Sequence, residues 1–560
     1  MDGTEAFSPA LSEFVQQLTM QLSVPFLLLS LLNSVRGATV VSPAASAAET
    51  QHITLDIVNG PVAPDGFTRI GVLANGTFPG PPIVATKGQT LVVKVNNNLT
   101  NDTMRLSTAI NFDGVFIDTD NNFNDGSPFV TQCPFGPGES YTYTLPLGDQ
   151  TGTFWYHSQL SVQYADGLRG TLVIYDPEDP LQHLYDVDDA STVLTVADWW
   201  HNTSTVGLAN YLLTQIIPVS DDGLVNGKGR FQGGPEVEYA AVPVKKGLRY
   251  RFRLINMSAR ANFLVSIDNR TPCRQIIEAD GVATEPHDVN ILTIFPGQRY
   301  SFVVNANQPI ANYWINAIIA GGNPAHNPNL NATLSRAILR YDGAPDAEPL
   351  VPMGQGPTGA DANMLNEWEL VPLVPIPAPE PDFNITFITA MTPNASSPTG
   401  FNTAWTINNI AYQSPTTPTL VKVLDGETSA ADFSPTENTF LFPANKTVQV
   451  EIVDATDEGH PFHMHGMNFW VVKSNGSDII NTVNPIRRDV DVTGNGNITL
   501  RFRTDKPGPW FFHCHIFYHF VVGLGSVIGA GLDEAAKSIH PTEAWEALCP
   551  AYSALPPNEQ

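Results

Sequence analysis

The segment GPWFFHCH, residues 508–515, is one of three aromatic stretches that recur along the chain. The other two are GTFWYHSQ at 152–159 and ANYWINAI at 311–318. Each aromatic stretch follows a strand-like segment within a few residues, and these segments are PGESYTYTLPL (137–147), PGQRYSFVVNA (296–306) and ITLRFRT (498–504). A pattern that returns three times at intervals of more than a hundred residues predicts one sheet unit used three times.

A second set of strand-like segments supports the same threefold division. Apolar and polar residues alternate in LVVKVNN (91–97), RYRFRLIN (249–256) and TVQVEIVD (447–454). The chain has 46 prolines and 43 glycines, and only 15% of its residues are charged, which is typical of short strands joined by many turns. We therefore predict an all-β fold of three consecutive Greek-key β-sandwich domains.

The domain boundaries are expected in turn-rich segments. VIYDPEDP at 173–180 closes the first unit and ILRYDGAPDAEP at 338–349 closes the second. The predicted organisation is a leader at 1–48 followed by domains at 49–180, 181–350 and 351–560.

The leader contains the only long apolar run, LSVPFLLLSLL at 22–32, which is too short to span a bilayer. Small residues follow it, as in a secretory signal, although acidic residues precede it and a buried core helix is the alternative. Acceptor triplets for N-linked glycans recur at Asn75, Asn98, Asn202, Asn331, Asn384 and Asn497. We expect a secreted, extracellular protein.

The charge of the chain excludes two classes of partner. Acidic residues outnumber basic ones 55 to 28, and the formal net charge is −27. Such a surface repels phosphate backbones and anionic lipids, so we expect neither nucleic acid nor a membrane surface as a partner.

Six of the thirteen histidines lie in two short segments, HPFHMHG at 460–466 and HCHIFYH at 513–519. Because alternate residues of a strand share a face, His513 and His515 are expected to point away from Cys514. Cys514 with His460 and His519 would give the thiolate and two imidazoles of a blue-copper site. The alternative is a set of structural histidines around a reduced cysteine.

Several segments together resemble fungal laccases of the multicopper oxidase family. They are DGSPFVTQCP, GTFWYHSQLSVQYADGLRG, RFRLIN, HPFHMHG and PGPWFFHCHIFYH. The resemblance implies three cupredoxin-like domains and a type 1 copper that takes single electrons from phenols. It also implies transfer through the His-Cys-His segment to a three-copper cluster that reduces dioxygen to water. By position, His460, Cys514 and His519 would be the type 1 ligands, with the non-coordinating Leu524 at the axial position.

The sequence departs from the family at the three-copper cluster. INFDG (110–114) corresponds to FHMHG (462–466) and HSQ (157–159) corresponds to HCH (513–515), so Asn111, Asp113 and Gln159 stand where the family has histidines. The three metal positions would pair His463 with Asn111, His157 and His515 with Asp113, and His465 and His513 with Gln159. Amide and carboxylate oxygens bind copper less well than imidazole, so we expect incomplete copper occupancy and impaired dioxygen reduction.

The altered cluster leaves three functions open. The first is a laccase-like oxidoreductase that oxidises phenolic or related aromatic molecules. The second is a non-catalytic copper-binding or electron-transfer protein, or an inactive subunit associated with an active laccase. The third is a different metalloenzyme, because Asp113, His157 and His515 match non-haem iron sites in ligand type. Asp125, in NDGSPF, matches a carboxylate that orients cluster ligands and relays protons in the family.

The resemblance also extends to the segment that binds the phenol in the family and to the cysteines. Arg260 stands where the family has an acid that binds the phenol, so it would attract an anion or lie exposed on a loop. Ala165 and Ala259 replace both cysteines of one family disulfide. Cys133 and Cys549 match the other disulfide, and Cys273 is left without an assigned role.

Overall fold

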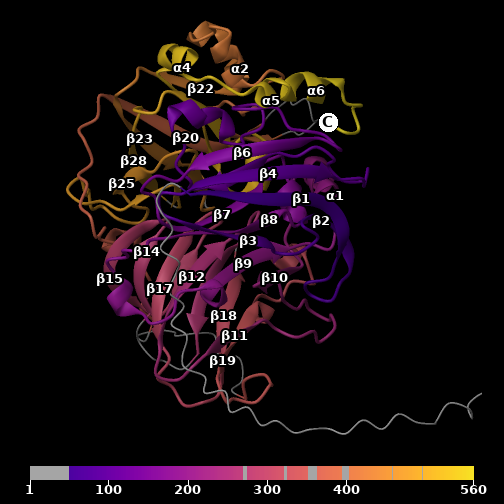
Figure 1. The fold of residues 1–560 in the computed structure, drawn as a ribbon, viewed down its shortest axis with the longest axis vertical. Helices are drawn as coiled ribbons and strands as arrows, with labels where there is room; N and C mark the ends of the chain where they lie inside the picture. Colours follow the sequence, from indigo (N-terminus) through magenta and orange to yellow (C-terminus); the bar gives the residue numbers. More distant parts are fainter. Residues whose placement is uncertain are drawn as a thin grey trace, which may run out of the picture. The chain divides into compact units, whose positions relative to one another are not determined.

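The computed structural model describes residues 49–268, 274–320, 324–350, 362–393, 403–456, 458–494 and 496–560 (Figure 1). The expected leader at 1–48 and Cys273 lie outside these residues. Strands dominate the described chain and form six sheets, two in each consecutive third of it. The prediction of an all-β fold with a threefold sandwich repeat is confirmed. No helix among the described residues is long and apolar enough to cross a membrane.

The first unit has two four-stranded sheets, ordered β2-β1-β4-β6 and β3-β8-β7-β5. Its strands are β1 (Thr50–Val62), β2 (Arg69–Ala74), β3 (Gly80–Thr86), β4 (Thr90–Asn98), β5 (Ile110–Asp113), β6 (Ser140–Pro146), β7 (Gly152–Ser158) and β8 (Arg169–Tyr175). In β4, Leu91, Val93 and Val95 are fully buried, while Lys94 between them faces solvent. This alternation is what places one face of the strand in the core.

The second unit has a six-stranded sheet, β10-β9-β12-β17-β14-β15, and a five-stranded sheet, β11-β19-β18-β13-β16. Its strands are β9 (Val193–Trp199), β10 (Asp222–Val225), β11 (Ala241–Val244), β12 (Arg249–Asn256), β13 (Asn262–Ile267), β14 (Arg274–Ala279), β15 (Val282–Val289), β16 (Leu292–Ile294), β17 (Arg299–Asn305), β18 (Asn312–Ala320) and β19 (Arg336–Tyr341). Helix α1 (Ser204–Thr214) lies between β9 and β10 in the chain.

The third unit repeats this plan with sheets β21-β20-β23-β28-β25-β26 and β22-β30-β29-β24-β27. Its strands are β20 (Phe383–Pro393), β21 (Thr403–Ile407), β22 (Thr439–Phe442), β23 (Thr447–Asp454), β24 (Pro461–Met464), β25 (Phe469–Lys473), β26 (Arg487–Arg488), β27 (Val490–Val492), β28 (Asn497–Arg503), β29 (Gly508–Cys514) and β30 (Gly525–Ala530). Its helices are α2 (Thr419–Leu424), α3 (Phe517–Phe520), α4 (Leu532–Ser538), α5 (Glu543–Glu546) and α6 (Leu548–Ala554).

The repeated segments occupy equivalent places in the three units. Strands β4, β12 and β23 each pair in parallel with a preceding strand and antiparallel with the strand of the second repeated segment, β6, β17 or β28. The aromatic stretches form β7, β18 and β29, each inside the other sheet of its unit. Strands β7 and β29 are buried along their whole length, which explains their nearly continuous apolar sequence.

The strand register confirms the internal correspondence between the first and third units. Strand β5 pairs with β7 so that Asn111 is opposite His157. Strand β24 pairs with β29 so that His463 is opposite His513. The two strand pairs therefore present side chains at matching positions in the two units.

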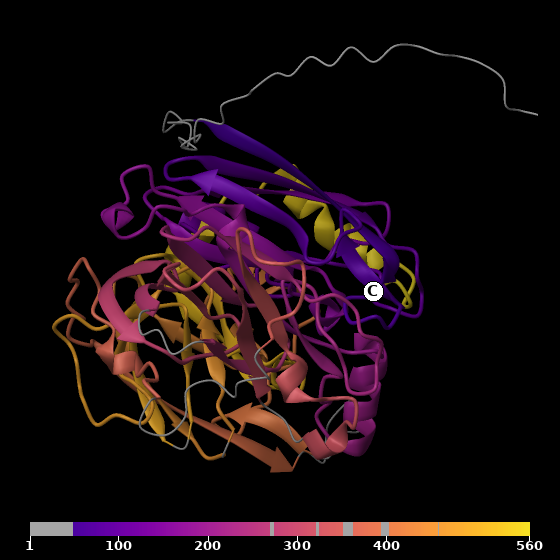
Figure 2. The ribbon, with the colours of Figure 1, turned by 90° about the horizontal axis from the view of Figure 1, so that it is seen from below.

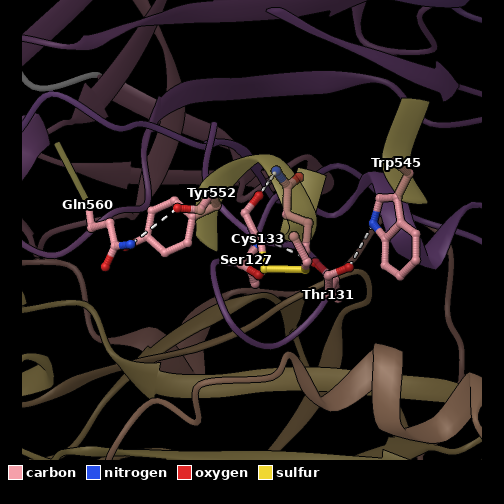
Figure 3. The surroundings of a disulfide bond; sticks show 8 residues. Ser127, Thr131, Cys133, Trp545, Tyr552 and Gln560 are labelled. Atoms are coloured by element: carbon pink, nitrogen blue, oxygen red, sulfur yellow. Dashed lines mark hydrogen bonds between the residues drawn. A yellow bond between two sulfur atoms is a disulfide. The ribbon is translucent and has the colours of Figure 1, made fainter. Parts of the chain in front are cut away.

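The C-terminal helices are joined to the first unit. A disulfide links Cys133 to Cys549, with Cα atoms 5.0 Å apart across 416 residues of sequence, as the resemblance implied (Figure 3). The indole nitrogen of Trp545 donates to the carbonyl oxygen of Thr131 at 2.9 Å. Figure 2 shows these yellow helices against the indigo strands of the first unit.

Candidate metal centre

The first cluster joins Cys514 to two histidines near the end of β29. Cys514 is the last residue of β29, His519 lies one turn further on in α3, and His460 immediately precedes β24. The Sγ atom of Cys514 is 3.7 Å from Nδ1 of His460 and 3.9 Å from Nδ1 of His519, and the two nitrogens are 3.1 Å apart. All three side chains are fully buried. The structure thus brings the expected thiolate and imidazole ligands together.

Aromatic, apolar and acidic side chains border this cluster, and Asp454 lies 3.7 Å from Nε2 of His460. The ring of Trp405 stacks on that of His519 at a centroid distance of 4.4 Å and meets the ring of His460 at 4.6 Å. Leu524 is fully buried, and its carbonyl oxygen accepts a hydrogen bond from the backbone N–H of Cys514. Burial raises the pKa of the Cys514 thiol well above its ordinary value and lowers the pKa of both histidines. A cation bound between them would therefore be the main stabiliser of a thiolate here.

The second cluster is built around the carboxylate of Asp113, which ends β5. Its Oδ2 atom is 2.8 Å from Nε2 of His515. Its Oδ1 atom is 3.2 Å from Nε2 of His463 and 3.4 Å from Nε2 of His157. One carboxylate from the first unit thus contacts imidazoles from the first and third units, and all four side chains are buried.

The charges in this second cluster follow from burial and proximity. Burial alone would raise the pKa of Asp113, but the imidazoles of His463, His515 and His157 hold that pKa well below its ordinary value. Burial would lower the pKa of His463, but Asp113 and Asp489 raise it to about 10. Burial lowers the pKa of His515, although Asp113 opposes that shift. At neutral pH the cluster therefore contains an Asp113 carboxylate paired with a His463 imidazolium.

A third group of side chains surrounds His465 and His513 and adjoins the second cluster, since the rings of His463 and His465 are 4.7 Å apart. The side chains of the second and third groups together are called the second cavity below. The Nε2 atoms of His465 and His513 are 3.1 Å apart, and the amide nitrogen of Gln159 lies 3.1 Å from Nε2 of His513. The amide nitrogen of Asn111 is 3.1 Å from Nδ1 of His465, whereas the sequence predicted Asn111 beside His463. The reason for this difference is that Asn111 also donates to the carbonyl oxygen of Asp125 at 2.7 Å, which directs its amide towards His465.

Asp125 lies where the sequence predicted it, next to a histidine of the cavity. Its two carboxylate oxygens are 3.2 and 3.1 Å from Nδ1 of His465. Ser127 donates its hydroxyl to Asp125 at 2.5 Å and lies 3.0 Å from the same histidine nitrogen. Asp125 and Ser127 together fix the orientation of the His465 ring.

Sequence reasoning missed the support that the middle unit gives to His463. The Nδ1 atom of His463 lies 3.1 Å from the carbonyl oxygen of Asp489, and the Asp489 carboxylate forms a bidentate ion pair with Arg299 of β17 at 2.7 and 2.8 Å. Arg299 and Asp489 are both buried. No local sequence signal identifies this pair, because Asp489 lies among other charged residues in RRDVDV (487–492).

Arg260 is buried rather than exposed on a loop. It is 8% exposed, and its guanidinium donates to the carbonyl oxygens of Ile217 and Pro218 at 3.2 and 2.7 Å. Its other terminal nitrogen is 3.5 Å from the carboxylate of Glu458. The alternative of an exposed loop residue is therefore wrong, whereas the expected attraction for a carboxylate agrees with the contact to Glu458. Glu458 in turn lies 3.7 Å from Nε2 of His519.

The two alanines at the positions of the lost family disulfide share one apolar cluster. Ala165 and Ala259 are both buried, together with Tyr164, Trp155 and Phe517. Because both cysteines are replaced, neither position leaves an unpaired thiol in this core.

Comparison with known proteins identifies the family. Multicopper oxidase family models match residues 56–179, 190–344 and 412–529. The chain belongs to the multicopper oxidase family. It is 44% identical to Laccase-2 of Agaricus bisporus over 522 residues, covering 92% of this chain and 96% of the relative. It is 43% identical to Laccase-4 of Trametes villosa over 520 residues, covering 91% and 95%.

A solved structure supports the same relationship. The crystal structure of the laccase from Botrytis aclada aligns with a TM-score of 0.79 and 30% identity, covering 92% of this chain and 93% of that one. The three cupredoxin-like domains and the resemblance to fungal laccases are thereby confirmed. This laccase-like chain belongs to a family that binds copper.

The two clusters differ in how well they suit copper. The Cys514 cluster fits, because a soft sulfur and two imidazole nitrogens converge at a fully buried position. In the second cavity the Asp113 carboxylate contacts the imidazoles and the Gln159 amide contacts Nε2 of His513, so its donor set differs from the all-histidine set that the resemblance implies for a three-copper cluster.

Proposed function

We propose that this laccase-like chain takes single electrons from phenolic or related aromatic molecules at a copper ion held by Cys514, His460 and His519. The observation that carries this proposal is the convergence of Sγ and two Nδ1 atoms within 3.9 Å of one another in a buried pocket. Copper bound there supplies a one-electron acceptor. Leu524 beside it has no donor atom, which favours a higher reduction potential than a methionine would.

The side of the Cys514 site at which we expect the electron donor to bind is acidic. Glu458 lies 3.7 Å from Nε2 of His519, and its side chain is 31% exposed. Arg260 lies 3.5 Å from the other carboxylate oxygen of Glu458 and offsets part of its charge. The whole chain has a net charge of −27. We therefore expect neutral phenols and aromatic amines to be better electron donors than aromatic carboxylates.

His513 and His515 would conduct electrons from the copper at Cys514 to the second cavity. They are the residues before and after Cys514 in the chain, and their side chains lie in that cavity. Asn111, Asp113 and Gln159 make that cavity a poor dioxygen-reducing centre, since oxygen-bearing side chains there replace imidazoles. Dioxygen would be reduced slowly, or another oxidant would accept the electrons. We expect this activity outside the cell, because an apolar leader precedes a domain structure that contains a disulfide.

A second function is a non-catalytic copper-binding or electron-transfer protein, including an inactive subunit that associates with an active laccase. The contact of the Gln159 amide with Nε2 of His513 favours this alternative, because it engages the nitrogen with which His513 would bind copper. Both functions share the copper at Cys514, so they differ in turnover rather than in colour.

The test is an assay of purified full-length chain for copper content, blue thiolate-copper absorption and reaction with a simple diphenol. Anaerobic bleaching of the blue colour by the diphenol, followed by slow oxygen uptake, supports the oxidoreductase. Blue colour without oxygen uptake supports the non-catalytic alternative. Copper-loaded protein without blue colour would overturn both functions, and Cys514→Ser serves as the colourless control.

Replacing Asn111, Asp113 and Gln159 with histidine tests whether these three residues slow dioxygen reduction. The triple variant Asn111→His, Asp113→His and Gln159→His should bind three more coppers per chain than the wild type binds at Cys514. Oxygen uptake with a diphenol should rise by at least about tenfold, because each metal position regains its imidazole. Full copper loading without faster uptake would show that the block lies elsewhere.

A further inference from the structure

We propose that Asp113, His157 and His515 bind one divalent metal ion of the iron(II) type in the second cavity. The proposal rests on the proposed loss of the three-copper cluster and names what the cavity holds instead. The ligand atoms of these three side chains lie within 4.8 Å of one another, and all three residues are fully buried. They come from both metal-bearing units, so the folded chain brings them together.

The orientation of His157 directs its second ring nitrogen at Asp113. The Nδ1 atom of His157 lies 2.8 Å from the carbonyl oxygen of Ser158, and because a carbonyl only accepts, that nitrogen carries a proton. The Nε2 atom faces Oδ1 of Asp113 at 3.4 Å, so it is the nitrogen available to a metal ion held by that carboxylate.

The carboxylate is held in place for this role by the third unit. His463 contacts the same Oδ1 atom at 3.2 Å, and its own Nδ1 is anchored on Asp489. His463 is therefore a positioning residue for Asp113. On the other side, Nε2 of His515 is 2.8 Å from Oδ2, which brings the second imidazole ligand to the same carboxylate.

The remaining imidazoles explain why we propose a single ion. The Nδ1 atom of His513 lies 2.9 Å from the carbonyl oxygen of Cys514, so its metal-binding nitrogen is Nε2. That nitrogen is already 3.1 Å from both the Gln159 amide and Nε2 of His465. The Gln159 amide is thus directed at the nitrogen with which His513 would bind a second ion, and that ion would have to displace this contact.

The donor set defines the class of metal. Two imidazoles and one carboxylate are typical of non-haem iron(II) sites, which leave other positions open for water or ligands. The side-chain oxygens of Asn111 and Gln159 are buried without a hydrogen-bond partner in the described part of the chain. Both amides contact His465 or His513 rather than the three proposed ligands, and buried water would satisfy their oxygens.

The experiment uses full-length metal-free chain carrying Cys514→Ser, so that the first site cannot contribute. Anaerobic titration with iron(II), followed by calorimetry and metal analysis, should give one ion per chain. Asp113→Asn should weaken binding by at least about 100-fold, because it removes the only anionic ligand. Asp222→Asn is the matched control: it changes a buried aspartate of the second unit and should leave iron binding unchanged.

Two results would overturn the inference. One is the binding of three copper ions per Cys514→Ser chain on loading with copper(II), which would show an intact three-metal cluster. The other is the absence of any bound iron(II), which would show that protons alone satisfy Asp113 and the histidines. Should Asp113→Asn fail to fold, His157→Gln tests the same site. Blue copper in the wild type is measured separately, so failure of the proposed function does not affect the iron count.

Discussion

Asp113 is the residue at which this chain departs most from an all-imidazole metal cavity. A histidine at that position would add a neutral ligand, whereas the carboxylate adds a buried negative charge that three imidazoles contact. A buried charge is tolerated only when it is paired, and His463 supplies the paired positive charge. The substitution therefore changes the electrostatics of the whole cavity as well as one ligand.

This charge pair predicts a pH dependence of stability. His463 has a pKa of about 10 in the folded chain against an ordinary value of 6.5, so its contribution is fully present below pH 6.5 and is lost as the pH rises towards 10. Over that window, the difference in free energy of unfolding between metal-free wild type and His463→Gln should shrink by about 1.4 kcal/mol per pH unit. Denaturant unfolding at several pH values measures it, and parallel curves for the two proteins would contradict the charge assignment.

At the scale of elements, the ends of strands and the turns between them position the clusters. Strands β5, β7, β24 and β29 end at or next to the metal-binding side chains. The turn before β17, in the middle unit, covers the cavity from another side. Gly297 in this turn has φ +84°, and a Cβ atom there would lie 2.7 Å from Cδ2 of His515. The described residues of the middle unit belong to neither metal-binding cluster, yet the backbone of this unit restricts where His515 can lie.

Gly297→Ala should therefore disturb metal binding as well as stability. Gly247→Ala is the matched control, because Gly247 has φ +94° but nothing within 4 Å of the added Cβ. Both variants should lose about 1 kcal/mol or more from backbone strain. Only Gly297→Ala should also weaken iron(II) binding in the Cys514→Ser background, by about tenfold or more, because the methyl group displaces His515. Equal metal affinity in the two variants would show that His515 adjusts without cost.

At the scale of the whole molecule, the three units depend on one another. The second cavity combines side chains of the first and third units, and Arg299 of the middle unit pairs with Asp489 behind His463. The Cys133–Cys549 disulfide fastens the C-terminal helices to the first unit (Figure 3). Contacts between units, rather than any one sandwich, create the site.

Removing the disulfide should destabilise the chain without abolishing the copper site at Cys514. Closing so long a loop restricts the unfolded chain, so Cys549→Ser should lower the free energy of unfolding by about 2–5 kcal/mol. Chemical denaturation measures the loss, and the blue absorption of copper-loaded protein monitors the Cys514 site. Wild type unfolded under reducing conditions is the control and should lose a similar amount. An unchanged free energy of unfolding would show that the helices are held by packing alone.

The sequence by itself determined the repeated β-sandwich plan, the thiolate cluster and the three departures from a histidine set. These features are readable because strand alternation and the spacing of Cys514, His513 and His515 are local properties of the chain. Only the tertiary structure decided that Asn111 contacts His465, that Arg260 is buried against Glu458, and that Asp113 lies among three imidazoles. Those outcomes depend on how separate units approach one another and on which partner satisfies each buried polar group. Spacing along a chain does not contain that information, because the partners are hundreds of residues apart and meet only in the packed molecule.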